Sequence, residues 1–372
     1  MLRPDQQIRY ARHLSLPGFG SEAQERLLAG SVLLVGAGGL GSPAALYLAA
    51  AGVGRLVIVD DDRVDLTNLQ RQVLYNTAGQ GKPKAESARE ALTSLNRDVE
   101  VEAVNERFAE KNARDLVRSC DIVLDGADNF PTRYLINDAA YLEKRPVVHG
   151  SIHLFEGQCT VFARDRGPCY RCLFPSPPPP GAVPSCAEAG VLGVLPGMIG
   201  VAQATEAIKL LTGLGDPLVG KLLMYDALAM QFRTLQIKRR PECPLCGDSP
   251  SITEAQTIAF SCPTAEAPEI EVSDLQPLQA EEQPCHLLDV REAREVALGM
   301  IPGSTHIPLG ELEDRMAEVT PWRDEQVICI CQVGQRSLRA AALLQHNGFG
   351  QAVSLRGGYA AWLMTQLREN GS

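Results

Sequence analysis

The sequence is poor in aromatic residues, which make up 5% of its 372 positions. It also has no apolar run of the roughly 18–20 residues that a membrane-spanning helix requires. Residues 1–6 lack the hydrophobic stretch of a secretory signal. We therefore expect a cytoplasmic protein with no membrane partner.

Lysine is absent from residues 262–372, which contain 16 acidic and 8 basic residues and so carry a net charge of −8. The formal net charge of the whole chain is −10. Because an acidic surface repels phosphate backbones, we expect no direct nucleic-acid partner.

Apolar strand-like runs alternate with helix-like segments along the chain, which is typical of an α/β fold with parallel sheets. The length favours two domains. We predict a first domain at 1–247, a linker at 248–267 and a smaller α/β domain at 268–372. The predicted strands are 32–35, 56–59, 99–104, 121–124, 146–149, 286–289, 327–331 and 352–355, and the predicted helices are 42–51, 84–95, 109–118 and 198–212.

A glycine motif stands between the first predicted strand and helix. Gly36, Gly38 and Gly41 form G-x-G-x-x-G, which lets the backbone approach phosphate at a helix N-terminus. Asp60 ends the next strand, where a carboxylate can bind ribose hydroxyls. These residues alone fit a nicotinamide-dependent dehydrogenase equally well.

Polar residues farther along favour a triphosphate instead. Asn68, Arg71 and Lys84 suit ATP and a leaving pyrophosphate, and Asp128-Asn129 follows a predicted strand. The Asp128 carboxylate suits Mg²⁺, which prefers oxygen ligands. ATP–pyrophosphate exchange would separate this interpretation from the dehydrogenase.

Two C-x₂-C pairs, Cys169/Cys172 and Cys243/Cys246, predict a four-cysteine Zn²⁺ site. Because all four ligand positions are filled, we expect a structural metal. Another cysteine, Cys186, follows a proline-rich loop and could attack an acyl-adenylate or resolve a disulfide; the alternative is an idle thiol.

Cys331 opens a short loop after a predicted strand, and Arg336 follows at C-x₄-R spacing. Loop amides and the helix from about residue 337 should stabilise a thiolate or persulfide. Cysteine phosphatases need C-x₅-R, so the shorter loop suits a single sulfur atom. Arg336 is expected to help hold an anionic donor. Cys329 is expected to face the core, pointing away from Cys331 by strand alternation.

Residues 1–247 resemble the ubiquitin-activating superfamily in its MoeB/ThiF branch. The resemblance implies a Rossmann-like domain that adenylates the C-terminal glycine of a ubiquitin-like sulfur carrier ending in Gly-Gly. Adenosine contacts would come from Gly39 and Asp60, and Arg12 would reach the partner's site in a homodimer. The matching stretches are residues 9–12, 36–41, 68–72, 128–129, 169–172, 186–191 and 225–227, and the nucleotide and magnesium ligands implied are Asn68, Arg71, Lys84, Asp128 and Asn129.

Residues 268–372 resemble a rhodanese domain in the stretches 288–292, 301–308, 331–337 and 357–362. The pair of domains resembles MoeZ-type fusions. This implies that a Cys331 persulfide, loaded from a persulfide or thiosulfate donor, converts the acyl-adenylate to a thiocarboxylate. A route through a Cys186 thioester and a non-catalytic docking protein remain as alternatives, and the carrier's identity is left open.

Overall fold

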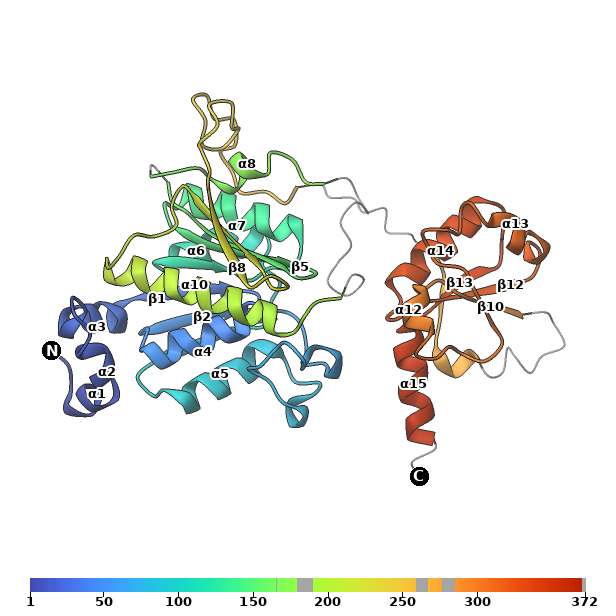
Figure 1. The fold of residues 1–372 in the computed structure, drawn as a ribbon, viewed down its shortest axis with the longest axis horizontal. Helices are drawn as coiled ribbons and strands as arrows, with labels where there is room; N and C mark the ends of the chain where they lie inside the picture. The colour runs from blue at the N-terminus through green and yellow to red at the C-terminus, as the bar shows by residue number, and fades with distance from the viewer. Residues whose placement is uncertain (165, 179–189, 259–266, 276–284, 370–372) are drawn as a thin grey trace. The chain divides into compact units, whose positions relative to one another are not determined.

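The computed structural model describes the chain except residues 165, 179–189, 259–266, 276–284 and 370–372 (Figure 1). The chain forms two compact units, Met1–Phe260 and Ser261–Ser372. Part of the predicted linker is packed, since Ala255 is buried in a core cluster of the first unit and Ile258 lies against the same cluster.

The first unit is built on an eight-stranded sheet with the order β3-β2-β1-β4-β5-β6-β7-β8. Strands β1 to β5 run parallel, and β6 to β8 continue the sheet as antiparallel neighbours. The strands are β1 (Ser31–Val35), β2 (Arg55–Val59), β3 (Glu100–Val104), β4 (Ile122–Asp125), β5 (Val147–His153), β6 (Glu156–Phe162), β7 (Lys221–Asp226) and β8 (Gln231–Gln236).

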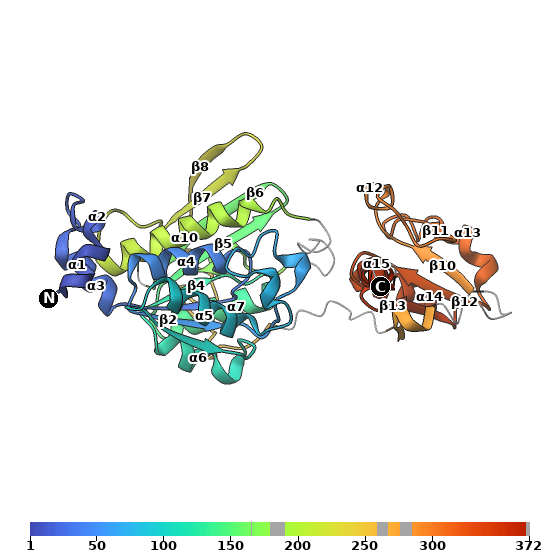
Figure 2. The ribbon, with the colours of Figure 1, turned by 90° about the horizontal axis from the view of Figure 1, so that it is seen from below.

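Alternation along the buried strands gives the sheet two apolar faces. Leu34 of β1 packs in one core cluster and Leu33 in another. The first cluster includes side chains of α4 (Gly41–Ala51), α5 (Lys84–Leu95) and α10 (Val194–Thr212). The second includes α6 (Glu110–Arg118) and α7 (Phe130–Leu142). The unit is therefore a three-layer α/β structure, with α10 beside α4 (Figures 1 and 2).

Helix α10 is long and apolar enough, by length and composition alone, to cross a membrane. Its Ile199 and Ala207 are fully buried in the core, and its Gln203 and Glu206 are buried as well. These contacts are those of a core helix, and a core helix passes the same test of composition.

The parallel strands and their helices confirm the predicted α/β class. The ends of the predicted strands and helices differ from the observed ends by a few residues. The sequence did not predict three strands, β6, β7 and β8, or the helix α7 that follows Asn129. It also did not predict α1 (Pro4–Arg9), α3 (Gly20–Ala29) or α8 (Tyr170–Leu173). Arg12 lies in the short helix α2 (Ala11–Leu14) near the N-terminus.

The second unit is a five-stranded parallel sheet with the order β11-β10-β12-β13-β9. The predicted strands at 286–289, 327–331 and 352–355 are its three central strands. The elements are β9 (Glu269–Ile270), β10 (Cys285–Asp289), α12 (Ala293–Val296), β11 (Ser304–His306), α13 (Met316–Val319), β12 (Gln326–Ile330), α14 (Gln335–His346), β13 (Ala352–Leu355) and α15 (Gly358–Glu369).

Candidate functional site

The glycine motif lies where the order of the parallel strands reverses, between β1 and β4. Gly36 follows β1 with φ +91°, and a Cβ there would lie 2.7 Å from the carbonyl oxygen of Gly126, which follows β4. A Cβ on Gly41 would lie 2.0 Å from the Gly36 carbonyl oxygen. Only glycine permits this packing, and ligands of open α/β sheets bind at such a reversal.

The segment after the 3₁₀ helix η1 (Leu66–Asn68) lies against the glycine loop. A Cβ on Gly39 would be 3.6 Å from the Cδ of Arg71. The Arg71 guanidinium donates to the Asn68 side-chain oxygen at 2.6 Å and to the Thr67 carbonyl oxygen at 3.3 Å. Both acceptors are uncharged, so Arg71 keeps its positive charge available beside the glycine loop.

Asp60 braces the glycine loop from the end of β2. One carboxylate oxygen accepts the Ala37 N–H at 2.8 Å and the other accepts the Asp62 N–H at 2.9 Å. Burial raises the pKa of Asp60, against the lowering influence of Lys84. Lys84 is almost fully buried, and its Nζ contacts the exposed Asp62 carboxylate at 2.8 Å. Tyr75 completes the brace by donating to the Ala37 carbonyl oxygen at 2.9 Å.

Asp128 stands on the turn after β4, and its side chain is exposed. Asn129 caps α7 by accepting the Thr132 N–H at 3.0 Å and donates to an Asp128 oxygen at 3.2 Å. Arg133 donates to the Ala127 carbonyl oxygen at 3.0 Å from one turn inside α7. The turn therefore holds its carboxylate at the same sheet edge as the glycine loop, and a carboxylate is a ligand that a hard cation prefers.

Two predicted site residues are not brought to this edge by the described structure. Arg12 is exposed on the short helix α2. Cys186 lies outside the described residues, as does Cys262.

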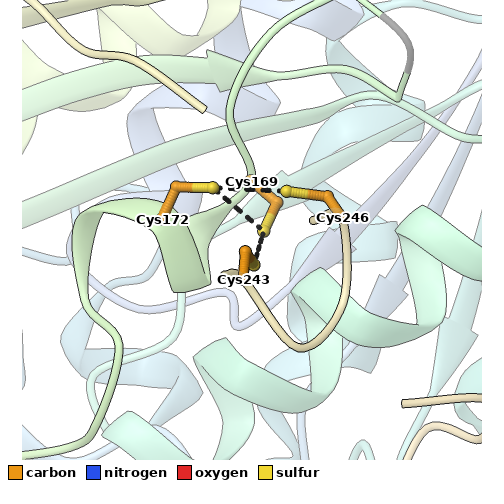
Figure 3. Close-up of side chains that lie close together, drawn as sticks. All are labelled: Cys169, Cys172, Cys243 and Cys246. Carbon is orange, nitrogen blue, oxygen red and sulfur yellow. Dashed lines mark hydrogen bonds between the residues drawn. The ribbon is translucent and has the colours of Figure 1, made fainter. Parts of the chain in front are cut away.

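The two C-x₂-C pairs meet as predicted (Figure 3). All four cysteines are buried, and their sulfur atoms lie within 4.8 Å of one another. The Cys169–Cys172, Cys169–Cys243 and Cys172–Cys246 sulfur separations are 4.0, 3.5 and 3.2 Å. A tetrahedral Zn–S bond of about 2.3 Å would place the sulfur atoms roughly 3.8 Å apart. The donor set therefore fits a metal ion that ties α8 to residues 243–246.

The four thiols interact with one another through their hydrogen bonds. Hydrogen bonds from the neighbouring thiols, that of Cys169 first, lower the pKa of Cys246 to about 5. The same interaction raises the pKa of Cys169. A bound cation would remove this difference between the two pKa values, because all four cysteines would then bind as thiolates.

Cys331 follows β12, and its sulfur accepts neutral hydrogen bonds. The Gly334 N–H lies 3.1 Å from Sγ, and the Ser337 hydroxyl lies 3.5 Å from it. Ser337 is held in turn by Ser354 at 2.8 Å. Gly334, with φ +98°, is the N-cap of α14. The loop thus directs a backbone amide and a helix start at one sulfur atom.

Cys329 is fully buried, as predicted, but it does not face away from Cys331. Residues two apart in a strand point to the same face, and both cysteines belong to one core cluster. Burial raises the pKa of Cys329, so the environment of this thiol, rather than its direction, disfavours the reactive thiolate.

Arg336 lies at the start of α14, where its guanidinium is held by a carboxylate. It makes a two-point ion pair with Glu295 of α12, at 2.6 and 2.7 Å. Burial by itself would raise the pKa of Glu295, but hydrogen bonds from Arg336 keep that pKa below its usual range. A second arginine, Arg291, is fully buried and pairs with Asp289 at 2.7 Å. It also reaches the Gln332 side-chain oxygen at 3.3 Å.

Sequence reasoning missed Glu295, Asp289 and Arg291 as neighbours of the Cys331 loop. They lie about forty positions away from it, and isolated charges in a sequence read as solvated surface. The parallel pairing of β10 with β12 was the signal that could have found Asp289 and Arg291, because it brings the ends of those strands together.

Family models match both units. The ThiF family model covers residues 10–245, and the Rhodanese-like domain model covers residues 272–365. The chain is 45% identical over 372 residues to the mouse adenylyltransferase and sulfurtransferase MOCS3, an alignment that covers 92% of this chain and 81% of the mouse protein. It is 43% identical over 373 residues to the probable adenylyltransferase/sulfurtransferase MoeZ of Mycobacterium tuberculosis, covering 97% and 94% of the two chains.

Residues of the first unit have further relatives. A sulfur carrier protein adenylyltransferase of Thermus thermophilus is 55% identical over 251 residues, covering 66% of this chain and 93% of that protein. The crystal structure of E. coli MccB with ATP matches in fold, with a TM-score of 0.56 at 21% identity, covering 64% of this chain and 73% of the other. The chain thus belongs to the ThiF family, as an ATP-using adenylyltransferase and sulfurtransferase that carries a rhodanese-like domain.

Proposed function

We propose that this enzyme adenylates the C-terminal glycine of a ubiquitin-like sulfur-carrier protein and then converts that glycine to a thiocarboxylate. The observation that carries the proposal is the presence, on one chain, of a phosphate-binding glycine loop with Arg71 against it and a sulfur-holding loop at Cys331. A relative that covers the first unit is named for acting on a sulfur-carrier protein, which supports the substrate class.

In the first step a carboxylate oxygen of the carrier attacks the α-phosphorus of ATP, and pyrophosphate leaves. The glycine loop and the start of α4 provide backbone donors for phosphate oxygens. Arg71 and Lys84 provide positive charge for the developing pyrophosphate. Asp128, with Asn129 beside it, would hold Mg²⁺, which supplies further charge compensation for the phosphates when bound.

In the second step the outer sulfur of a Cys331 persulfide attacks the carbonyl carbon of the acyl-adenylate, and AMP leaves. The product is an acyl disulfide on Cys331. A second thiol then attacks the Cys331 sulfur, which releases the carrier thiocarboxylate and leaves a disulfide between the two cysteines. Cys186 is the candidate for that thiol, and the alternative route forms a Cys186 thioester before sulfur arrives.

The remaining features extend this proposal. Zn²⁺ is the metal that a buried set of four thiolates fits best, and it would stabilise the fold. A homodimer would let Arg12 act in the partner's site, and the enzyme would work in the cytoplasm. The sulfur donor would be a persulfide or thiosulfate.

The test uses a recombinant ubiquitin-like sulfur carrier ending in Gly-Gly, with a carrier lacking the last glycine as control. Carrier-dependent ATP–pyrophosphate exchange reports adenylation, and mass spectrometry of the carrier reports the thiocarboxylate. In Cys331→Ala we expect exchange to persist and thiocarboxylate to fall to background. Undiminished thiocarboxylate in that variant would remove the rhodanese-like unit from the reaction.

A further inference from the structure

Arg336 is the one cation of the Cys331 loop, and its charge is already compensated. Residues 332–335 are uncharged. Two nitrogen atoms of Arg336 face the two oxygen atoms of Glu295 at 2.6 and 2.7 Å. The pair is largely shielded from water, with side-chain exposures of 9% and 23%. A shielded pair of this geometry presents little net charge to a third group.

The second arginine near the loop is compensated in the same way. Arg291 and Asp289 are both buried, and Asp289 accepts three hydrogen bonds from the guanidinium. The Arg291 guanidinium also lies over the Tyr359 ring, 4.0 Å from its centroid. Each of these arginines is therefore held by a carboxylate of its own, whereas the Cys331 sulfur accepts from the neutral Gly334 N–H and Ser337 hydroxyl.

This balance distinguishes between sulfur donors. Thiosulfate is a dianion, and burying it beside Cys331 requires positive charge that is not already used. A persulfide, R–S–S⁻, carries at most one negative charge, and that charge is on the sulfur to be transferred. Neutral amide and hydroxyl donors suffice for a single sulfur anion, as they do for the Cys331 thiolate.

We propose that Glu295 selects the sulfur donor by withholding the charge of Arg336 from the Cys331 loop, so that the site accepts persulfides in preference to thiosulfate. This inference rests on the proposed sulfur-transfer role of Cys331. In the transfer, the Cys331 thiolate attacks the outer sulfur of the donor R–S–SH, and the S–S bond breaks. The thiolate R–S⁻ leaves, the persulfide remains on Cys331, and no net oxidation or reduction occurs.

The test is Glu295→Gln in the full chain. The amide keeps the shape and one acceptor for Arg336 but removes the negative charge. Loading of one sulfur atom on Cys331 is followed by mass spectrometry, with thiosulfate and with cysteine persulfide as donors. We expect the ratio of kcat/KM for thiosulfate to kcat/KM for cysteine persulfide to rise by about tenfold or more, because Arg336 attracts the dianion more strongly once the Glu295 charge is removed. An unchanged ratio would overturn the proposal.

The matched control is Glu311→Gln, which breaks an exposed glutamate pair with Arg315 in the same unit at 2.9 Å. Its donor ratio should equal that of the wild type. A second variant, Glu295→Gln combined with Arg336→Gln, removes both charges and should return the ratio to the wild-type value. If the raised ratio survives the loss of Arg336, the charge of Arg336 is not the cause.

Arg336→Gln alone covers the case in which Glu295→Gln does not fold. It removes the cation that pairs directly with the Glu295 carboxylate, so the donor ratio should fall below the wild-type value. No change or a rise would contradict the proposal. Failure of the underlying function looks different, because wild-type Cys331 would then take up sulfur from neither donor.

Discussion

Arg71 and Arg336 stand beside two anion-handling loops of the same chain, and their surroundings differ. Arg71 is oriented by the neutral oxygens of Asn68 and Thr67. Arg336 is held by the carboxylate of Glu295. The first arrangement fixes a guanidinium while keeping its charge for a polyphosphate, and the second cancels the charge while keeping the shape of the loop.

The difference follows from what each loop must hold. ATP and pyrophosphate carry several negative charges, so a cation beside them is most effective when its own support is uncharged, as for Arg71, whereas Lys84 contacts the Asp62 carboxylate. A thiolate or persulfide carries one charge, which the Gly334 N–H and the Ser337 hydroxyl of the Cys331 loop can stabilise without a cation. An arginine beside an anion site is therefore informative only together with its partner.

The largest expected effect is that of Asp128→Ala on the adenylation site. Losing the carboxylate that would anchor the metal should lower carrier-dependent ATP–pyrophosphate exchange by about 10²–10³-fold. The residue is exposed, so folding should persist. Sulfur loading of Cys331 should be unchanged. Asp115→Ala, which removes another exposed aspartate paired with Arg118, is the control. Near-normal exchange in folded Asp128→Ala would exclude the carboxylate from the mechanism.

A second substitution tests the comparison directly. Arg71→Gln removes a charge that the structure leaves available, so exchange should fall by about 10²-fold and the KM for ATP should rise. Arg71→Lys should restore part of the activity, since it keeps the charge and loses the planar fork. If Arg71→Gln changes exchange by less than about threefold, Arg71 is a surface charge and the contrast with Arg336 fails.

A third prediction tests whether the metal binds and stabilises the first unit only. Cys169→Ser should remove bound zinc, as measured by elemental analysis, and lower the melting temperature of the first unit by about 10 °C in calorimetry, because structural metal binding contributes to folding. The melting of the second unit should not move. Cys120→Ser changes a buried cysteine outside the four-cysteine cluster and should keep its zinc. Zinc-free wild-type protein with unchanged melting would contradict the assignment.

Local motifs carried much of the prediction. The two C-x₂-C pairs and the Cys331 loop each lie within a few residues, so their spacing predicted a metal site and a sulfur-holding loop. The glycine loop is equally local, but its spacing left a dehydrogenase open until Asn68, Arg71 and Asp128 were considered. Strand β8 was missed because all six of its residues are exposed, which removes the apolar alternation that marks a strand. The pairing of Glu295 in α12 with Arg336 in α14 joins residues 41 positions apart, and no local pattern encodes it.

The smallest expected effect concerns a buried pair that supports the Asp128 turn. Asp125 ends β4, and one of its oxygens accepts the Ala127 N–H at 3.0 Å. The other lies 2.6 Å from Nδ1 of His149, its register partner on β5, and both side chains are almost fully buried. The histidine therefore fixes the carboxylate that shapes the turn on which Asp128 stands.

His149→Phe should raise the Mg²⁺ concentration for half-maximal exchange by about threefold to tenfold, the size of one buried hydrogen bond. His149→Asn should stay near the wild type, because its amide nitrogen can occupy the place of Nδ1, whereas His149→Gln reaches too far and should resemble His149→Phe. The control is His286→Phe in the second unit, where His286 pairs with Glu325 and stacks on Trp322. It should lower stability without changing the Mg²⁺ requirement. Equal Mg²⁺ curves for His149→Phe and His149→Asn would show that the pair supports the fold and not the turn on which Asp128 stands.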